Sequence, residues 1–483
     1  MIESTRKKIL GFYALGLAVL WVFYLELGTT ESSIIVLLAS VLNILVFGIL
    51  LYKELKYCPD FHPFMLLLIA GIQYVGFNGV SLYQTVMEGE RLTFGIYDIT
   101  NDLPKGALFL SLEHLLLYMG FAKVQSKYER RLEPTIHQRL MQSNVNFYKV
   151  AIGFYGFVWL LRVLENFVDL QAINSVLYNV TNQGQMVTLF FLLVAYLKTG
   201  YRKYMQIHWI ILAVEFVMVL SSGMKEVMMQ NFIPYVIYLF VQVKSGSRNL
   251  NTSFIVKMGV IGAFVVFFVF PYVSLYREIN WIEERNASVS EVLSEYVEYM
   301  TTDKPSTENN RDVDYMMERT GSLGSNTFSI MYADNYGIQP IYMATAFSAI
   351  IPRFLWPNKP TIRIGLMVQL MANGNRNWQN TKGQGGAAYT PGFIGSCYMS
   401  LGLLYALIMP FIMGIFVTKF WYYFKKRIAE NVIAIWAIFT IVATAYKDFE
   451  NFYDGGVIFC AFALVYCLII NYMEKNGYSK RVS

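Results

Sequence analysis

The chain has 483 residues, of which 55% are apolar, 15% are charged and 16% are aromatic. Soluble proteins average about 25% charged residues. The apolar residues fall into about twelve blocks of roughly twenty residues, the length that a helix needs to cross a bilayer. This composition excludes a nucleic-acid-binding protein, a disulfide scaffold and a disordered chain. It indicates a polytopic membrane protein, and the formal net charge of +6 needs no acidic partner.

The blocks predict twelve transmembrane helices, because a backbone in lipid must satisfy its own hydrogen bonds. The first block follows three basic residues, is longer than a signal-peptide core and has no cleavage site after it, so we expect it to be retained. The predicted spans are 9–27, 33–52, 63–86, 105–124, 148–167, 184–200, 207–222, 226–243, 254–276, 393–418, 431–446 and 456–473.

The basic residues predict the orientation of these spans. Most of the 39 Lys and Arg residues flank the ends that face the cytoplasm if both termini are cytoplasmic. The chain then divides into nine spans with short loops (1–276), one large outer-face loop (277–392), three further spans (393–473) and a cytoplasmic tail (474–483). The predicted fold class is therefore an all-α polytopic membrane protein whose large outer loop, between helices nine and ten, contains short helices.

The outer loop combines ten basic with twelve acidic residues, so it is nearly neutral. Its acidic stretch from Ser288 to Met300 is typical of a helix. The apolar segment from Ile338 to Ile351 is too short to span and predicts a half-buried or re-entrant helix. The loop ends in GQGGAAYTPGFIGS, whose glycines would let the chain bend back into the membrane.

Charged residues within apolar spans are costly and are candidates for function. Arg162 lies in the outer half of the fifth predicted span, with Glu165 on the same helical face. It either forms a structural Arg–Glu pair or lines an outward-facing cavity and binds an anion. Lys225 occupies the outer turn after span seven, above Glu215, and is a second candidate for function. The alternative is an ordinary surface lysine. For Glu113 and His114 we favour a satisfied polar contact over a proton relay.

A cationic cluster in the outer loop is the strongest candidate site. It contains Arg319, Arg363 and the turn IPRFLWPNKP, which holds Arg353, Trp356 and Lys359. The prolines fix φ and favour a rigid extended turn. Arg binds phosphate bidentately, and Trp prefers the lipid–water boundary. The alternative is an interfacial anchor without catalytic function.

Familiar catalytic motifs are missing from the sequence. It contains no P-loop, dinucleotide fingerprint, HExxH motif or nucleophile elbow. Asp312 and Asp314 have the spacing of a DxD metal site but lie in a solvated acidic stretch. The four cysteines form no CxxC pair and are interpreted as apolar filler. We therefore expect neither a metal nor a cofactor, and the predicted topology leaves no histidine as a base on the outer face.

The segments RTGSLGSNTF and IPRFLWPNKP, in one large outer loop before three final spans, resemble the Wzy-type oligosaccharide repeat-unit polymerases of O-antigen and capsule synthesis. The GMKE turn at Lys225 resembles a turn of that family in which arginine is commoner. The topology match covers the whole chain, and the motif match covers about thirty residues. The related O-antigen ligases use an outer-face histidine, which the predicted topology does not provide.

The resemblance implies an inverting, metal-independent glycosyltransferase in the bacterial plasma (inner) membrane. It would transfer a growing glycan from undecaprenyl pyrophosphate onto a new lipid-linked repeat unit, alongside a flippase and a chain-length regulator of the same pathway. Arg353 and Lys359 would neutralise the leaving diphosphate, and Asp334 would be the base, with Asp448, Glu450 and Asp454 as rivals. The expected substrate-binding residues are Arg162, Lys225, Arg277, Arg319, Arg363 and Trp356.

Three other functions remain open. An O-antigen ligase or related transferase would use the same lipid carrier. A flippase or transporter also suits twelve spans, although transporters commonly show two related halves. This chain instead concentrates its unusual residues in one asymmetric loop. A non-catalytic subunit of an export assembly is the remaining alternative.

Overall fold

The computed structural model describes residues 2–27, 32–58, 60–129, 134–165, 174–220, 225–244, 260, 268–277, 279–280, 285–301, 323–339, 356, 364–375, 392–428, 434–438, 441 and 464. The helices in this part of the chain are α1 (Ile2–Glu26), α2 (Ser33–Tyr57), α3 (Phe64–Gly71), α4 (Asn78–Met87), α5 (Leu103–Glu129), α6 (Ile136–Gln142), α7 (Phe147–Glu165), α8 (Asn174–Thr199), α9 (Arg202–Leu220), α10 (Lys225–Lys244), α12 (Phe270–Arg277), α13 (Val289–Thr301), α15 (Leu323–Tyr336), α17 (Ile364–Ala372), α18 (Phe393–Leu401) and α19 (Leu403–Lys425).

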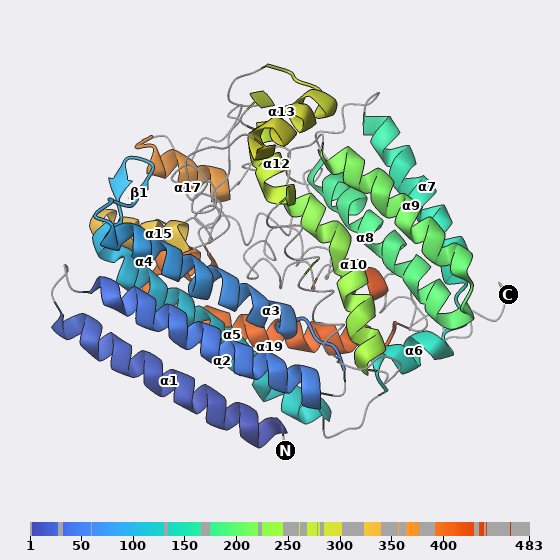
Figure 1. The fold of residues 1–483 in the computed structure, drawn as a ribbon. Coiled ribbons are helices and arrows are strands. Elements are labelled where there is room, and N and C mark those ends of the chain that lie inside the picture. The colour runs from blue at the N-terminus through green and yellow to red at the C-terminus, as the bar shows by residue number, and fades with distance from the viewer. Residues whose placement is uncertain are drawn as a thin grey trace.

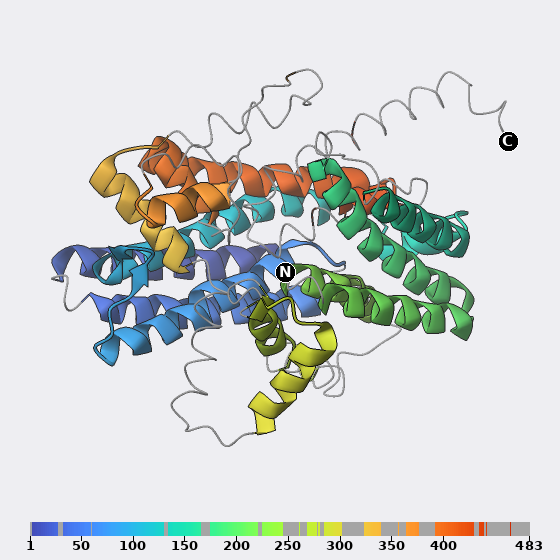
Figure 2. The same cartoon turned by 90° about the horizontal axis from the view of Figure 1, so that it is seen from above.

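The helices form two groups (Figures 1 and 2). In the first group α1, α2, α5 and α19 pack side by side, and α3 and α4 cover α2. In the second group α8 packs against α7, α9 and α10. A short antiparallel hairpin, β1 (Thr93–Phe94) and β2 (Tyr97–Asp98), connects α4 to the 3-10 turn η2 (Thr100–Asp102) before α5. We call the end of the first group that carries this hairpin the hairpin end, and the opposite end, next to α6, the α6 end.

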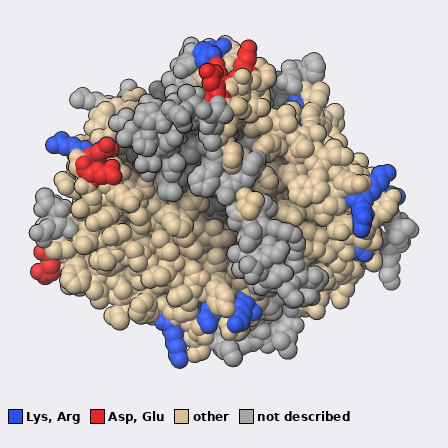
Figure 3. Space-filling view, viewed as in Figure 1, with Lys and Arg blue, Asp and Glu red and all other residues tan. Residues whose placement is uncertain are grey.

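The prediction of a mostly helical chain with apolar helices that could cross a membrane is confirmed. Among the described residues, six helical runs are long and apolar enough to cross a membrane, and they match the first five predicted spans and the tenth. Large apolar side chains on their outer faces are exposed, for example Phe12, Leu15, Leu45 and Leu404. Figure 3 shows a broad uncharged surface with charged side chains mainly at its edges. Such a surface is stable against lipid and not against water.

Close backbone contact between α5 and α19 holds the first group together. Gly120 of α5 lies against the carbonyl of Phe411, and Gly414 of α19 lies against the carbonyl of Leu117, so a Cβ at either glycine would overlap backbone. Small residues allow this approach in a bilayer, where packing and not water exclusion drives helix association. Nearby, Tyr13 donates to Asn43 at 2.5 Å and Asn43 donates to Ser111 at 2.8 Å. These buried bonds join α1, α2 and α5.

The third predicted span contains a π-helical segment, η1 (Ile72–Phe77), between α3 and α4. The hydroxyl of Ser40 on α2 donates to the carbonyl of Val75 at 3.0 Å. This bond satisfies a carbonyl within the π segment, which lacks the regular i→i−4 pattern. The span therefore remains one helical run from Phe64 to Met87 with a local widening.

The tenth predicted span differs from the expected single helix over 393–418. Gly402 has φ +78° and separates the short helix α18 from α19. Because glycine adopts positive φ without steric cost, the chain turns there, and only α19 has the length of a span. Gly392, also at positive φ, precedes α18. The predicted bend of the glycine-rich segment back into the membrane stays a prediction, because residues 383–391 lie outside the described part of the chain.

The segment 277–392, which the sequence predicts to be an outer loop, contains short helices among its described residues. The expected acidic helix over 288–300 is α13, which packs on α12 through Val292 and Tyr296. The expected apolar helix over 338–351 lies almost entirely outside the described residues, and Ile338 at its start is not helical. A buried helix does occur earlier in the loop, α15. Spans nine, eleven and twelve lie largely outside the described residues, so their number and sidedness stay predictions.

Candidate functional site

The hairpin end is built around α15, which enters the first group between α5 and α18. Asn326 of α15 donates to the carbonyl of Gly106 at 3.0 Å. Gly106 and Gly395 are each so close to α15 that a Cβ would overlap Thr327 or Asn326. The carboxylate of Glu113 accepts the backbone N–H of Ile394 at 2.7 Å, which anchors the start of α18. Glu113 thus makes a polar contact between α5 and α18.

Asp334 is the predicted base, and it lies in the last turn of α15. Its two oxygens have different donors: Lys105 of α5 forms an ion pair with Oδ2, and the Tyr398 hydroxyl of α18 donates to Oδ1 at 2.7 Å. The side chain of Asp334 is 34% exposed and that of Lys105 is 20% exposed. An ionised carboxylate has about four acceptor positions. Asp334 can therefore hold both partners and still accept a hydroxyl from outside.

Aromatic rings line α15 on another face. Phe328, Tyr332 and Tyr336 recur every four residues and contact one another in sequence. Tyr97 of β2 packs against all three, with centroid distances of 5.5, 6.0 and 6.0 Å. Burial and, secondarily, neighbouring Tyr336 raise the pKa of Tyr97, and burial raises the pKa of Tyr332. Both phenols are therefore protonated at neutral pH and can donate hydrogen bonds.

Arg162 lies on α7 and faces Glu215 of α9. Its guanidinium donates to both carboxylate oxygens at 3.0 and 3.1 Å, and Gln185 of α8 donates to Oε2 of the same carboxylate. Glu215 is fully buried, whereas the Arg162 side chain is 20% exposed. The Arg–Glu pair is therefore formed between helices. The side chain of Glu165, the partner expected from sequence, lies outside the described residues.

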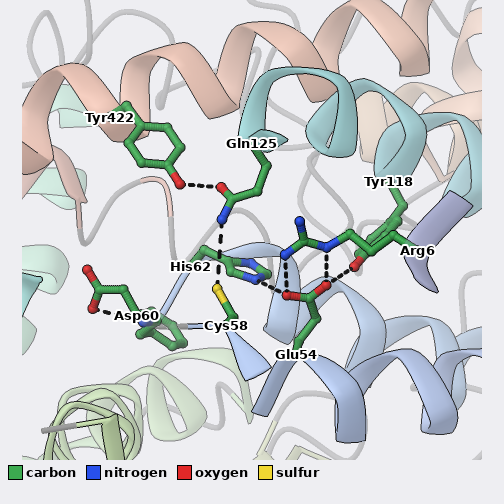
Figure 4. A network of polar contacts seen from close by, with 9 residues as sticks. Arg6, Glu54, Cys58, Asp60, His62, Tyr118, Gln125 and Tyr422 are labelled. Atoms are coloured by element: carbon green, nitrogen blue, oxygen red, sulfur yellow. Dashed lines mark hydrogen bonds and ion pairs between the residues drawn. The ribbon is translucent and has the colours of Figure 1, made fainter. Parts of the chain in front are cut away.

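A second charged cluster lies at the α6 end (Figure 4). The guanidinium of Arg6 on α1 donates two hydrogen bonds, of 2.5 and 2.7 Å, to the carboxylate of Glu54 on α2. Both side chains are at most 3% exposed. The hydroxyl of Tyr118 donates to Glu54 at 2.6 Å, and Nε2 of His62 lies 3.1 Å from the other oxygen. Glu54 thus connects α1, α2, α5 and the segment before α3. Bidentate geometry with additional donors is what a buried ion pair requires.

Neighbouring polar groups extend this end. Asp60 pairs with Lys425 of α19 at 2.8 Å and accepts the backbone N–H of Ile136 at 2.9 Å. The latter bond holds α6, whose own start is a capping box formed by Thr135 and Gln138. Burial lowers the pKa of His137 on α6, so this side chain is neutral at pH 7. The α6 end is therefore tied together by side chains from both halves of the chain.

One group at this end has the composition of a metal site. The ligand atoms of Glu54, Cys58 and His62 lie within 4.8 Å of one another, and all three residues are buried. A Glu, Cys and His set suits Zn²⁺. The side-chain amide of Gln125 donates a hydrogen bond to the Cys58 sulfur at 3.7 Å, and its oxygen accepts one from the Tyr422 hydroxyl. However, Arg6 already neutralises Glu54, which weakens the attraction for a cation.

The remaining predicted site residues are placed only in part. Trp356 is 39% exposed. Lys225 begins α10 and Arg277 ends α12, but their side chains are not among those described. Arg319, Arg353, Lys359 and Arg363 lie outside the described residues, as do Asp448, Glu450 and Asp454. Asp334 and Arg162 belong to different clusters, because α15 and α7 lie on opposite sides of the molecule in Figures 1 and 2.

Sequence reasoning missed the cluster at the α6 end. It treated Arg6 as an orientation signal and Cys58 as filler. The available signals were a glutamate in the last turn of an apolar helix and the four-residue spacing of Glu54, Cys58 and His62, which places the first two on one helical face. It also missed Lys105 and Tyr398 as partners of Asp334. Their sequence separations from Asp334, 229 and 64 residues, carry no local signal.

The fold and its clusters define a helical protein with apolar helices long enough to cross a membrane, in which α15 packs between α5 and α18. The model of a family described as a domain of unknown function (DUF8712) matches residues 107–446, and the chain belongs to this family. The match includes Arg162, Glu215, Asp334 and Tyr398, and it begins after Arg6, Glu54 and Lys105. No curated protein and no solved structure matches the chain.

Proposed function

We propose that this protein is a polysaccharide polymerase of the bacterial inner membrane, an inverting and metal-independent glycosyltransferase. Its substrates would be undecaprenyl-pyrophosphate-linked oligosaccharides, delivered by a flippase and extended under a chain-length regulator. The observation that carries the proposal is the environment of Asp334: a partly exposed carboxylate, held by Lys105 and Tyr398, on a loop helix that lies at the end of an apolar bundle. A lipid-linked sugar needs such a group beside the membrane.

In the proposed reaction, a hydroxyl of the acceptor repeat unit attacks the anomeric carbon of the donor glycan. The new C–O bond forms as the bond between that carbon and the pyrophosphate oxygen breaks, with inversion. Asp334 accepts the hydroxyl proton as general base. The pyrophosphate leaves on its lipid carrier and takes the bonding electrons. Lys105 and Tyr398 orient the carboxylate and keep one face available to the acceptor.

Cations must neutralise the leaving pyrophosphate, and fixed Arg and Lys side chains can do so without a metal. Arg162 is a weaker candidate for this role than the sequence suggested, because its guanidinium is occupied by Glu215. We assign the role to Arg353 and Lys359, assisted by Arg319 and Arg363. Lys225, Arg277 and Trp356 complete the proposed binding residues.

The test is the glycan ladder of cells that lack the gene and are complemented with variants. Wild type should restore a ladder, whereas Asp334→Asn and Arg353→Ala should leave a single lipid-linked repeat unit despite normal membrane insertion. Glu90→Gln is the matched control, because Glu90 is an exposed carboxylate in the segment that leads to the hairpin. It should restore the ladder fully.

The other outcomes identify other functions. Full-length polymer that accumulates on its carrier in the deletion strain would indicate a ligase. Loss of even the single repeat unit from the outer face would indicate a flippase. A full ladder with Asp334→Asn would contradict the proposed base, and a full ladder with Arg353→Lys would contradict bidentate phosphate binding by Arg353.

A further inference from the structure

The last turns of α19 form an aromatic and basic surface at the α6 end. Phe416, Phe420 and Tyr423 recur at intervals of four and three residues, so they share one face of the helix. Arg427, in the turn after α19, folds back onto this face, with its guanidinium 3.8 Å from the centroid of the Tyr423 ring. Phe416 is 37% exposed, and the other three side chains are partly exposed. We call these four residues the α19 stripe.

The stripe passes from an apolar to a polar level of the helix. Ile412, four residues before Phe416, is 47% exposed, and α19 is long and apolar enough to cross a membrane. This apolar run ends at Lys425, two residues before Arg427. Tyrosine prefers the lipid–water boundary, where Tyr423 then lies. A lipid chain that packs along the phenylalanines would bring its headgroup to Arg427.

Two arginines at this level have N–H donors to spare. NH1 of Arg427 donates to the carbonyl of Tyr423 at 3.1 Å. NH1 of Arg139, on α6, donates to the carbonyl of Lys426 at 2.9 Å, next to Arg427 in the chain. Neither guanidinium forms another hydrogen bond or an ion pair with any residue that the structure describes. Because a guanidinium has five N–H donors, both can bind an anion without releasing the backbone.

The charge around the stripe favours an anionic ligand. Neither α6 nor α19 contains an acidic residue. Asp60, which lies near both helices, is paired with Lys425. The exposed Lys419 lies on α19 between Phe416 and Tyr423, and adds further positive charge. Arginine binds phosphate through two parallel N–H···O bonds, and phosphate is the anionic group of a membrane lipid at this depth.

We propose that the α19 stripe and Arg139 bind an anionic phospholipid. Its phosphate binds Arg427 and Arg139, and an acyl chain lies along Phe420 and Phe416. Phosphatidylglycerol has the required chemistry, a phosphodiester with a net negative charge on an apolar tail. The lipid ties α6, which connects the two helix groups in the chain, to the end of α19. The inference is independent of the proposed function. The alternative is an interfacial anchor that accepts any lipid.

The experiment measures lipid binding by the full-length protein in an uncharged detergent. Fluorescent phosphatidylglycerol and phosphatidylcholine are titrated, with anisotropy as the readout, in high salt, which screens the general attraction of surface cations. Wild type should bind phosphatidylglycerol about tenfold more tightly than phosphatidylcholine. Arg427→Gln and Arg139→Gln should each weaken this binding by about tenfold, the loss expected for one charge-assisted contact. Arg427→Lys should recover little, because an ammonium cannot bind phosphate bidentately.

Lys56→Gln is the matched control. Lys56 is an exposed cation at the end of the apolar helix α2, also at the α6 end, and it lies over the rings of Tyr52 and Tyr57 at 5.6 and 5.3 Å. Its loss should change the affinity for phosphatidylglycerol by less than about twofold in high salt.

A second pair of variants tests the acyl chain. Phe416→Ala should weaken binding by about threefold through loss of apolar contact, whereas Phe12→Ala, an exposed phenylalanine of α1, should not. Gel filtration shows that each variant is folded, which the partial exposure of the substituted side chains favours.

Three outcomes would overturn the inference. Equal affinity of wild type for the two lipids, or unchanged affinity in both glutamine variants, would leave only an interfacial anchor. Full affinity of Arg427→Lys would reduce the phosphate contact to general charge attraction. Inorganic phosphate separates the lipid from a soluble anion. It should not displace the fluorescent lipid, and displacement at the affinity of the lipid would contradict the role of the acyl chain.

Discussion

The hairpin end and the α6 end contain the same three kinds of group in opposite surroundings. At each end a carboxylate pairs with a cation and accepts a tyrosine hydroxyl: Asp334 with Lys105 and Tyr398, and Glu54 with Arg6 and Tyr118. Glu54 is fully buried and Arg6 is 3% exposed, whereas the Asp334 side chain is 34% exposed.

Burial decides what each arrangement can do. Two charges removed from water need near-ideal partners, and once they have these they resist any change of position. The Glu54 cluster is therefore suited to fixing helices. A partly exposed pair costs little to rearrange and contributes little to stability. Asp334 can exchange or share its partners with a substrate, so its cluster is suited to chemistry.

The largest loss of stability is expected for Glu54→Gln. The change leaves the guanidinium of Arg6 buried without a counter-charge, and the free energy of unfolding should fall by about 3 kcal/mol or more. Thermal unfolding in nanodiscs, followed by tryptophan fluorescence, measures the loss.

Two controls accompany this variant. Glu3→Gln removes a partly exposed carboxylate that pairs with the exposed Lys7 on the same helix as Arg6, and it should change stability by less than about 0.5 kcal/mol. Combining Glu54→Leu with Arg6→Met removes both charges and should restore part of the loss. Equal stability of Glu54→Gln and wild type would show that the two ends do not differ as argued.

An intermediate loss of stability is expected for Arg162→Ala, in the second helix group. Removal of the guanidinium leaves the fully buried carboxylate of Glu215 without its counter-charge, although Gln185 still donates to it. The free energy of unfolding should fall by about 2 kcal/mol, less than at Glu54 because Arg162 is 20% exposed. The same unfolding measurement applies, with Lys149→Ala, an exposed cation on the same helix, as the control. If Arg162→Ala abolished polymerisation at unchanged stability, Arg162 would bind the substrate anion after all.

A small loss of stability is expected for Asp334→Asn and Lys105→Gln. Each removes one partner of a partly exposed pair, so the free energy of unfolding should change by less than about 1 kcal/mol. Polymer synthesis should nevertheless stop with Asp334→Asn and weaken with Lys105→Gln, which loses only orientation of the carboxylate. Unfolding curves and glycan ladders from the same preparations test both effects. A destabilisation as large as that of Glu54→Gln would make Asp334 a structural residue.

The helices were predictable to a greater extent than the clusters. The first eight spans were predicted from apolar blocks, and the corresponding helices begin within about ten residues of the expected positions. The prediction succeeds because a backbone in lipid must satisfy its own hydrogen bonds, which a helix does. The division at Gly402 was not foreseen. The positive φ of one glycine in an apolar run cannot be predicted from the local sequence, because it depends on the packing of α18 against α15.

The partners of charged residues could not be predicted in the same way. The sequence identified Arg162 and Asp334 as candidates from their positions, but Glu215 and Lys105 are separated from them by 53 and 229 residues. Only the packing of helices brings these residues together. Arg6 was interpreted from the rule for cytoplasmic flanks, which is satisfied equally by a solvated or a buried arginine. Its burial depends on Glu54 and Phe121, neither of which is near in sequence.

Removal of metals is expected to change neither polymer synthesis nor stability. Glu54, Cys58 and His62 could hold Zn²⁺, yet Arg6 and Tyr118 already satisfy the carboxylate, and the proposed reaction neutralises its leaving group with side chains. Excess chelator should leave polymer synthesis and the unfolding temperature unchanged. Elemental analysis of the purified protein should show no stoichiometric zinc. Zinc that Cys58→Ser removes, with a lower unfolding temperature, would mean that the α6 end is fixed by a metal as well as by an ion pair. Strict dependence of synthesis on Mg²⁺ or Mn²⁺ would instead contradict the metal-free reaction at the hairpin end.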